Sequence, residues 1–447
     1  MRRRLWYHSQ PVRSKNLRYS LAVLFAVNIL NFYDRQVLGA LLEPVRKEFG
    51  LSDTQLGWLG TLPIVLYALM GVPLGRLADS GSRKRLLAAG VTVWAALTAF
   101  GGVARAYWML MLSRLGVYVG EAACAPTGTS WIGDLFPADR RSWALAVFML
   151  GVPLGAALSH IIGGPVAQHW GWRAALITAA LPAVLLIPAL LGLHEPERGA
   201  SDKHRTVTAS PWSLLRIPTM WWIIASGALV NFNLYALATF FPAFLTRYHH
   251  LSIGAAGFWA GIGYGVCGVL GGIAAGIVGD RIIRKRQNGR MLAAAAAALL
   301  AAPFSLAGIL QDPGAAAPAI ILIMTAYGLL NMYYGTVYAA IQDLVAPALR
   351  GTAMSVYFLA MYLCGASFGP LITGRLSDYL AHSAAAAAGS AVVNETFRAV
   401  GLHQAMYVIP LFSAGLALVL YAGSRTIVAD VARGAEAGRQ AAVQPAS

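Results

Sequence analysis

Long apolar stretches recur along the whole of this 447-residue chain, and they limit its fold more than any other feature. About 20 consecutive apolar residues form a helix long enough to cross the hydrocarbon core of a bilayer. Hydrophobic residues make up 58% of the sequence and charged residues only 12%, which is more apolar surface than a soluble fold could place in its interior. A bilayer accepts that surface, and helices satisfy the backbone within it. The sequence therefore predicts an all-α membrane protein.

Twelve spans are predicted, in two sets of six separated by a polar stretch. They lie near 18–42, 54–77, 86–104, 108–133, 142–168 and 173–193, and then near 219–246, 254–278, 290–310, 317–341, 351–376 and 402–423. The expected organisation is a basic arm over 1–17, a six-helix bundle over 18–193, a linker over 194–218, a second six-helix bundle over 219–423 and a tail over 424–447.

Basic residues outnumber acidic ones by 34 to 18, and most of them fall in the arm, the linker, the tail and the loops on the same side of the predicted spans. The positive-inside rule places that side in the cytoplasm and residues 377–401 outside. Short basic clusters between apolar runs do not indicate nucleic acid. We expect a multi-pass protein of the inner (plasma) membrane, monomeric, surrounded by membrane lipids and with both termini cytoplasmic.

The two halves of the sequence repeat each other at three corresponding places. Asn31-Phe32 matches Asn231-Phe232, the segment from Gly75 to Lys84 matches that from Gly276 to Lys285, and the segment from Asp134 to Arg141 matches that from Asp343 to Arg350. Parallel repeats of this kind are typical of transporters, in which the substrate path runs between the halves near the membrane midplane.

The segment from Gly75 to Lys84 resembles the cytoplasmic signature of the major facilitator superfamily, Gly-x-x-x-Asp-Arg/Lys-x-Gly-Arg/Lys-Arg/Lys, and departs from it at Ser80 and Ser82. Within the superfamily, the spinster branch is similar at 31–35, 113–122, 132–136 and 195–200. The resemblance implies two pseudo-symmetric six-helix bundles that work by alternating access, and a transporter rather than an enzyme.

Four ionisable side chains fall inside the predicted spans of the first half: Asp34, Arg35, Arg114 and Glu121. Each costs about 2.5–3.5 kcal/mol on membrane-insertion scales, so such residues indicate function. The first and fourth spans both line the central path in the superfamily, so we expect Asp34 to meet Arg114 and Arg35 to meet Glu121. Because arginine keeps its charge, a coupled proton would have to bind Asp34 or Glu121. The alternative is a static network that holds the two spans together.

Polar and aromatic side chains mark the rest of the expected substrate path. They are Asn31, Tyr118, Asn231, Asn331, Tyr334, Tyr338 and Tyr357. A charged first half facing an uncharged, aromatic second half would suit an amphiphile with an ionic head and an apolar tail. The alternative is that the rings only pack between helices.

A cytoplasmic gate is expected from the signature and its repeat, because the matching residues of the superfamily form a latch of charges at helix ends. Its residues are Gly75, Asp79, Arg83, Lys84, Asp134 and Arg140 in the first half, and Asp280, Arg281, Asp343 and Arg350 in the second. The alternative is a set of ordinary positive-inside loops.

Pairs of glycines four residues apart predict close packing of helices. They are Gly71/Gly75, Gly151/Gly155, Gly272/Gly276 and Gly365/Gly369. The sequence shows no metal-ligand spacing and no phosphate-binding loop for ATP.

The resemblance thus implies a proton-coupled secondary transporter for an amphiphilic anion, such as a lysophospholipid or a sphingoid phosphate, with the proton as coupling ion and no other cofactor or metal. Two alternatives remain open: a transporter of small organic anions or drugs, and a membrane scaffold or sensor without flux.

Overall fold

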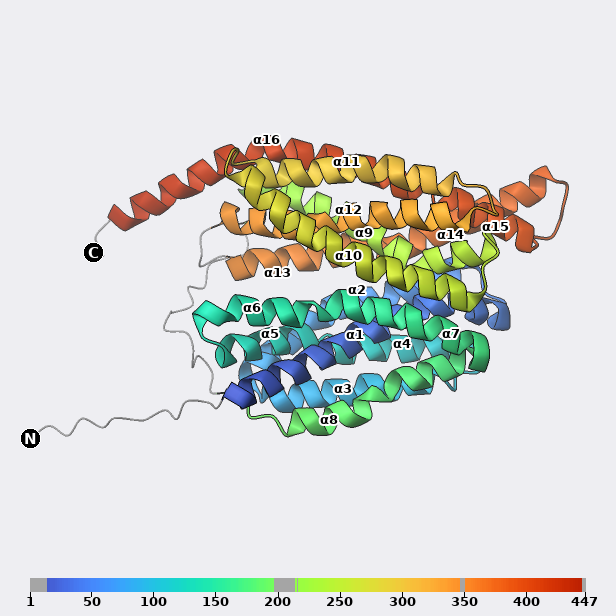
Figure 1. The fold of residues 1–447 in the computed structure, drawn as a ribbon, viewed down its shortest axis with the longest axis horizontal. Helices are drawn as coiled ribbons and strands as arrows, with labels where there is room; N and C mark the ends of the chain where they lie inside the picture. The colour runs from blue at the N-terminus through green and yellow to red at the C-terminus, as the bar shows by residue number, and fades with distance from the viewer. Residues whose placement is uncertain (1–13, 197–213, 215, 346–349, 444–447) are drawn as a thin grey trace, which may run out of the picture.

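The computed structural model describes residues 14–196, 214, 216–345 and 350–443, and these residues are almost wholly helical (Figure 1). The first half contains α1 (Ser14–Phe49), α2 (Asp53–Ser80), α3 (Arg83–Gly101), α4 (Tyr107–Glu121), α5 (Cys124–Leu135), α6 (Ala138–Met149), α7 (Gly151–Ala180) and α8 (Pro182–Leu191). The second half contains α9 (Pro218–Arg247), α10 (Ile253–Ile283), α11 (Gly289–Ile309), α12 (Ala316–Leu344), α13 (Arg350–Met361), a π-helical turn (Tyr362–Ala366), α14 (Phe368–Ala387), α15 (Glu395–Ala405) and α16 (Val408–Val443).

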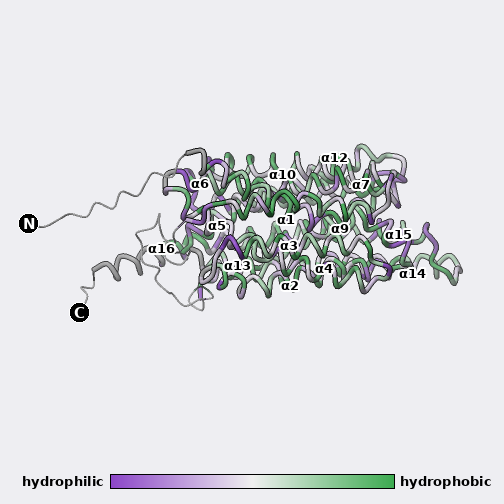
Figure 2. The backbone as a smooth tube through the Cα atoms, turned by 90° about the horizontal axis from the view of Figure 1, so that it is seen from below, coloured by the Kyte–Doolittle hydropathy of each residue, from purple (hydrophilic) through white to green (hydrophobic). Residues whose placement is uncertain are grey.

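The helices form two bundles that lie side by side, α1–α8 in one and α9–α16 in the other (Figure 1). Helix α1 begins and α16 ends at the same end of the molecule, which we call the terminal side; the opposite end is the far side. Hydrophobic residues fill the middle of the bundle and hydrophilic ones gather towards its two ends (Figure 2).

Eight helical stretches among the described residues are long and apolar enough to cross a membrane. One of them, Trp143–Leu191, covers two predicted spans. The chain leaves helical geometry between these spans, at Gly171 (φ +82°). Glycine reaches this φ without a steric penalty. Exposed tryptophans lie near the terminal side, as Trp143 and Trp221, and near the far side, as Trp108 and Trp170. Such belts are typical of the two interfaces of a bilayer.

Two of the breaks within the predicted spans bear on the site described below, and the apolar pattern does not show them. The span 108–133 is interrupted directly after Glu121, since α4 ends there and α5 begins at Cys124. Pro126 explains the break, because it has no N–H to donate to the carbonyl of Ala122. The span 351–376 contains the π-helical turn, closed by a 3.1 Å hydrogen bond from the Ser367 N–H to the Tyr362 carbonyl. Such turns are frequent at functional sites.

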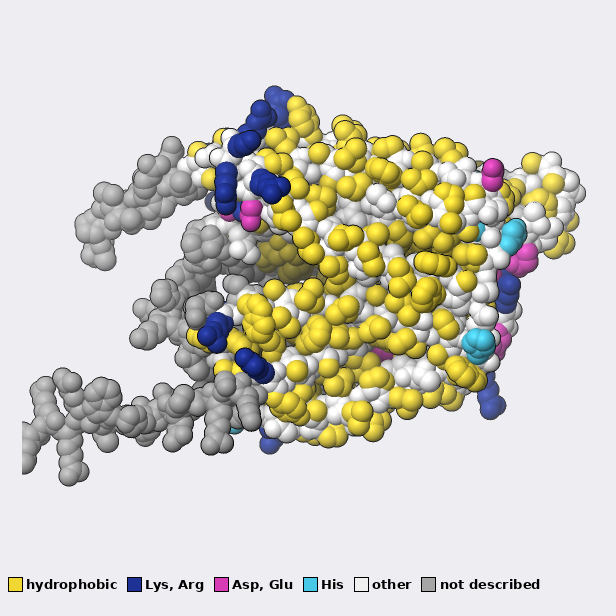
Figure 3. Space-filling model, in the orientation of Figure 1, with side chains coloured by type: hydrophobic (Ala, Val, Ile, Leu, Met, Phe, Trp, Pro, Cys, Tyr) yellow, Lys and Arg dark blue, Asp and Glu magenta, His cyan; other side chains and the backbone are white. Residues whose placement is uncertain are grey.

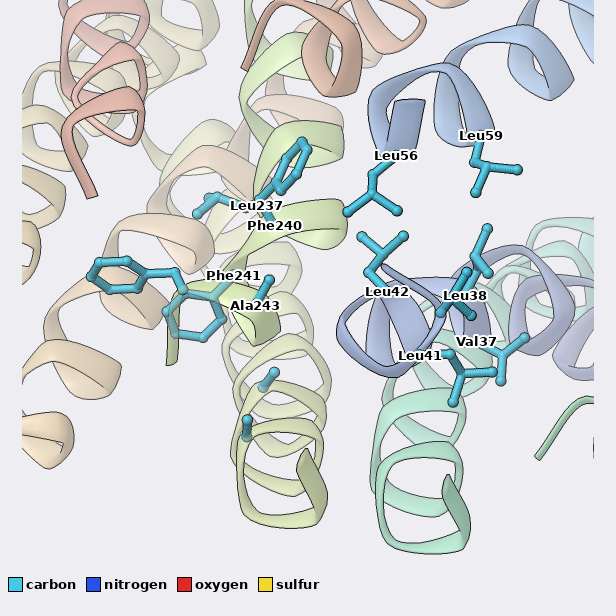
Figure 4. Packing of buried hydrophobic residues seen from close by; sticks show 14 of the residues in the cluster. Val37, Leu38, Leu41, Leu42, Leu56, Leu59, Leu237, Phe240, Phe241 and Ala243 are labelled. Atoms are coloured by element: carbon cyan, nitrogen blue, oxygen red, sulfur yellow. The ribbon is translucent and has the colours of Figure 1, made fainter. Parts of the chain in front are cut away.

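The largest buried cluster crosses the seam between the two bundles near the far side. Figure 4 shows leucines of α1 and α2, including Leu42 and Leu56, facing Phe240 on α9. Parting the bundles here would expose these side chains, at about 1.5–3 kcal/mol for each one that reaches water. Apolar packing therefore helps to hold the far side closed.

At the terminal side, in contrast, the two bundles lie apart. A β-carbon placed on Gly71 or Gly75 of α2, or on Gly272 or Gly276 of α10, would have no atom within 4 Å. The predicted close packing is therefore wrong for these two pairs, whereas Gly155 and Gly369 do pack tightly against backbone carbonyls. Figure 3 shows a hollow between the two bundles at this end.

Candidate functional site

The four predicted intramembrane charges come together in the first bundle. Asp34 and Arg35 lie on α1, Arg114 and Glu121 lie on α4, and none of them is more than 7% exposed. The Nε of Arg35 lies 3.1 Å from Oε2 of Glu121, so this predicted ion pair is confirmed. The predicted pair of Asp34 with Arg114 is wrong, because Nη2 of Arg114 donates to the backbone carbonyl of Asp34 at 2.6 Å and not to its carboxylate.

Several polar atoms of this cluster are buried without a hydrogen-bond partner in the described part of the chain. They are both carboxylate oxygens of Asp34, Oε1 of Glu121, Nη1 of Arg114 and Nδ2 of Asn31. A buried group left unsatisfied costs about 1–3 kcal/mol, so a fold retains such groups where they have a use. A cavity of about 30 Å³, lined in part by Arg35 and Arg114, lies beside them and has room for one water molecule.

Aromatic rings from both bundles surround the Arg35 guanidinium. Its central carbon lies 3.8 Å from the ring centroid of Tyr67 and 5.7 Å from that of Tyr118, both in the first bundle. Tyr362 of the second bundle packs on Tyr67 at 5.5 Å and on Tyr235 at 6.4 Å. A cation over ring faces is stabilised electrostatically. Sequence reasoning missed Tyr67, which lies alone in an apolar run without a charged neighbour.

The second bundle places most of its predicted path residues in one layer. The hydroxyl of Tyr334 donates to Oδ1 of Asn231 at 2.9 Å, and the ring of Tyr338 lies 5.4 Å from that of Tyr334. Tyr357 is completely buried, with its hydroxyl 3.1 Å from that of Tyr333. Its ring packs against that of Tyr338, so Tyr357 stabilises this layer. Asn331 donates to the Tyr327 carbonyl of its own helix.

A network of buried charges joins the two bundles at the far side, and sequence reasoning missed it. Arg247 at the end of α9 donates from Nε to Glu43 of α1 at 2.7 Å and from Nη1 to Asp53 of α2 at 2.8 Å. Arg46 pairs with Glu43 at 2.6 Å, and Ser377 of α14 donates to Asp53 at 2.6 Å. The available signal was a charged residue at each helix end, which is also what an ordinary surface loop shows.

The charges of the terminal side pair within each bundle. Arg83 at the start of α3 pairs with Asp134 of α5 and with Glu195, at 3.3 Å in the second case. Burial alone would raise the pKa of Glu195, but hydrogen bonds from Ser82, Arg83 and Lys84 outweigh it and hold that pKa below its usual range. Ser82, which departs from the family signature, also accepts a bond from the Arg85 N–H and so caps α3.

The second bundle repeats this arrangement with Arg290, which pairs with Asp343 and lies 3.6 Å from Asp280. Arg140 and Arg281 are exposed. The side chains of Asp79 and Arg350 lie outside the described part of the structure. The predicted latch therefore stays a prediction, since the pairs described here lie within one bundle and not between the two.

This arrangement, two six-span bundles with a charged centre between a closed and a parted side, matches a known family. The family model of the Major Facilitator Superfamily matches residues 24–370. The chain belongs to this superfamily. Its fold implies twelve spans, which confirms the predicted fold class.

Relatives place the chain near the spinster branch, as its motifs predict. It is 32% identical over 366 residues to an MFS-type efflux pump of Mycolicibacterium smegmatis, covering 81% of this chain and 84% of that protein. It is 27% identical over 402 residues to the sphingosine-1-phosphate transporter SPNS2 of Danio rerio, covering 84% and 79%. It also resembles the crystal structure of a bacterial homolog to the human lysosomal transporter Spinster, in an inward-facing and unoccupied conformation, with 27% identity, a TM-score of 0.84, and coverage of 93% and 98%.

The open glycines of α2 lead to a first prediction. Gly75→Leu should be accommodated in this conformation, because a β-carbon at this position would have no atom within 4 Å. The variant should also stabilise the helix by up to about 1 kcal/mol, since leucine has a higher helix propensity than glycine. It should reduce transport strongly, because closure of the terminal side would bring α2 against the other bundle. Transport and thermal unfolding of the purified variant measure the two effects. Gly415→Leu, at another open position on α16, is the control, and equal transport by both variants would contradict the prediction.

Proposed function

We propose that this superfamily member is a proton-coupled secondary transporter of an anionic, lipid-like amphiphile, working by alternating access. The observation that carries the proposal is the buried cluster in which Arg35 pairs with Glu121, while the Asp34 carboxylate has no ion pair among the residues that the structure describes. An isolated carboxylate in a low-dielectric interior is far more stable when it binds a proton. Asp34 is therefore the proton carrier of the conformation described here.

The anionic head of the substrate would bind at Arg114, whose Nη1 is buried and unsatisfied. Arginine suits a phosphate because its planar guanidinium donates two parallel hydrogen bonds. Approach of that anion to Arg114, close to the Asp34 carboxylate, favours the protonated form of Asp34 because two anions repel. This repulsion links substrate binding to proton binding. The tyrosine layer of the second bundle offers the apolar surface for a tail, and the transporter of Danio rerio supports a sphingoid phosphate as the substrate class.

The proposed orientation places the terminal side in the cytoplasm of a cell with an inner (plasma) membrane. The exposed basic side chains of that side, such as Arg85, Arg140 and Arg286, support it through the positive-inside rule. In that orientation the conformation is open inward. We expect a cysteine at Ser390 to react with a membrane-impermeant reagent added to intact cells, and a cysteine at Ser201 to react only after lysis. Labelling of the Ser201 site in sealed cells would reverse the orientation.

Transport into proteoliposomes tests the function. A lysophospholipid or a sphingoid phosphate should accumulate only when a pH gradient is imposed. Dissipating the gradient with an added protonophore should release the accumulated lipid. Uptake that is indifferent to the gradient would refute proton coupling. The M. smegmatis relative favours a second candidate, efflux of drug-like molecules, and accumulation of such compounds in place of the lipid would favour it.

A further inference from the structure

A groove runs along the seam between the two bundles on the surface that faces the membrane, between α7 and α10. Its volume is about 430 Å³. It is lined by apolar residues and glycines, namely Leu154, Ala157, Ile161, Gly261, Ile262, Gly265, Val266, Val269 and Leu270. None of them lines the cavity beside Arg35, so the groove is separate from the site described above.

The groove exists because α7 and α10 diverge towards the terminal side. A β-carbon placed on Gly257 or Gly261 of α10 would lie 2.9 or 2.6 Å from a backbone carbonyl of α7. One placed on Gly268 would lie 4.0 Å from Pro153, and one on Gly272 or Gly276 would meet nothing within 4 Å. The two helices thus form a V that is closed towards the far side and open towards the terminal side.

The exposed face of α10 continues the groove to a pair of arginines. Val266, Leu270, Ile273 and Ile277 follow one another at helical spacing and are between 48% and 59% exposed. The same face ends in Arg281 and Arg284, both exposed. Figure 3 shows apolar side chains over α7 and α10, with Lys and Arg side chains gathered at the terminal end of the second bundle. An apolar groove at membrane depth that leads to two cations is complementary to one lipid tail and a phosphate.

We propose that this groove binds an anionic phospholipid of the leaflet on the terminal side, with one acyl chain between α7 and α10 and the phosphate against Arg281 and Arg284. The inference rests on the membrane fold and not on the proposed substrate. Because the V narrows when the terminal side closes, a bound chain stabilises the conformation that is open on that side. A ligand that binds one conformation better shifts the population towards it.

The binding test uses purified full-length protein, with phosphatidylglycerol as the probe and phosphatidylcholine as the neutral comparison, in the absence of any transport substrate. Native mass spectrometry should show retention of phosphatidylglycerol. The double variant Arg281→Gln/Arg284→Gln should weaken retention of phosphatidylglycerol about tenfold, since each arginine near an anionic lipid headgroup strengthens binding to it. Val266→Phe should weaken retention of both lipids by filling the groove. Arg425→Gln and Ile321→Phe, at exposed positions elsewhere in the second bundle, should bind as the unmodified protein does.

The conformational test compares nanodiscs with and without phosphatidylglycerol. Spin labels at Arg85 and Gln287, exposed on the terminal side of the two bundles, should show more of the longer distance when the anionic lipid is present. Equal retention of the two lipids, or unchanged retention in both groove variants, would overturn the inference. Glu121→Gln separates the proposals, because it should impair transport yet retain the lipid. Unimpaired transport in this variant would contradict only the proposed function, and lost lipid retention would contradict only the groove.

Discussion

Asp34→Asn is expected to abolish proton-driven accumulation while leaving substrate binding largely intact. The substitution fixes a neutral side chain at a buried carboxyl for which the described residues show no ion pair, so the proton can no longer associate and dissociate. Arg114 keeps its hydrogen bond to the Asp34 backbone carbonyl, which the substitution does not remove. Uptake into proteoliposomes with and without a pH gradient measures coupling, and a substrate-induced shift of the unfolding temperature measures binding.

Glu121→Gln is the matched comparison for this prediction. It removes the counter-charge of the buried Arg35, a loss that typically costs about 3–5 kcal/mol, so transport and stability should both fall. Asp34→Asn should leave stability nearly unchanged, because it breaks no ion pair. If Asp34→Asn still accumulates substrate against its gradient when protons drive uptake, Asp34 is not the carrier, and the proton would have to bind Glu121.

Arg247→Ala is expected to open the far side. The substitution leaves Glu43 and Asp53 buried with less compensating charge, at a typical cost of about 3–5 kcal/mol for a broken buried pair. That free energy is lost only while the two bundles are joined at the far side, since water solvates the carboxylates once they part. Spin labels at Arg105 and Asp312, in exposed loops of the two bundles, should therefore report a longer distance.

The control for Arg247→Ala is Arg173→Ala. Arg173 pairs with Glu48 at 2.6 Å within the first bundle, and both side chains are more than a third exposed. Exposed pairs contribute little, about 0–1 kcal/mol, so the distance across the far side should not change. An unchanged distance in Arg247→Ala as well would mean that the apolar seam around Leu42 and Phe240 alone keeps this side closed.

Sequence reasoning found the elements whose signals are local. A 20-residue apolar run specifies a membrane helix by its own composition, and a charge inside such a run stands out because its insertion is costly. Asp34, Arg35, Arg114 and Glu121 were identifiable for that reason, whereas the pairing of Arg35 with Glu121 was expected from the resemblance to the superfamily, in which the first and fourth spans both line the path. The breaks after Glu121 and at Tyr362 were harder to see, because each lies within an otherwise continuous apolar run.

The sequence by itself determined the membrane class, the twelve spans, the repeat and the family. Only the tertiary structure decided which charges pair and which side is closed. Arg247 is far from Glu43 and Asp53 in the chain, and each of the three resembles an ordinary loop charge until packing buries them together. The same holds for Asp34, because Arg114 of the neighbouring helix α4 points to the backbone carbonyl of Asp34 and not to its carboxylate. Burial and pairing are properties of a packed arrangement, and electrostatic free energies depend steeply on both.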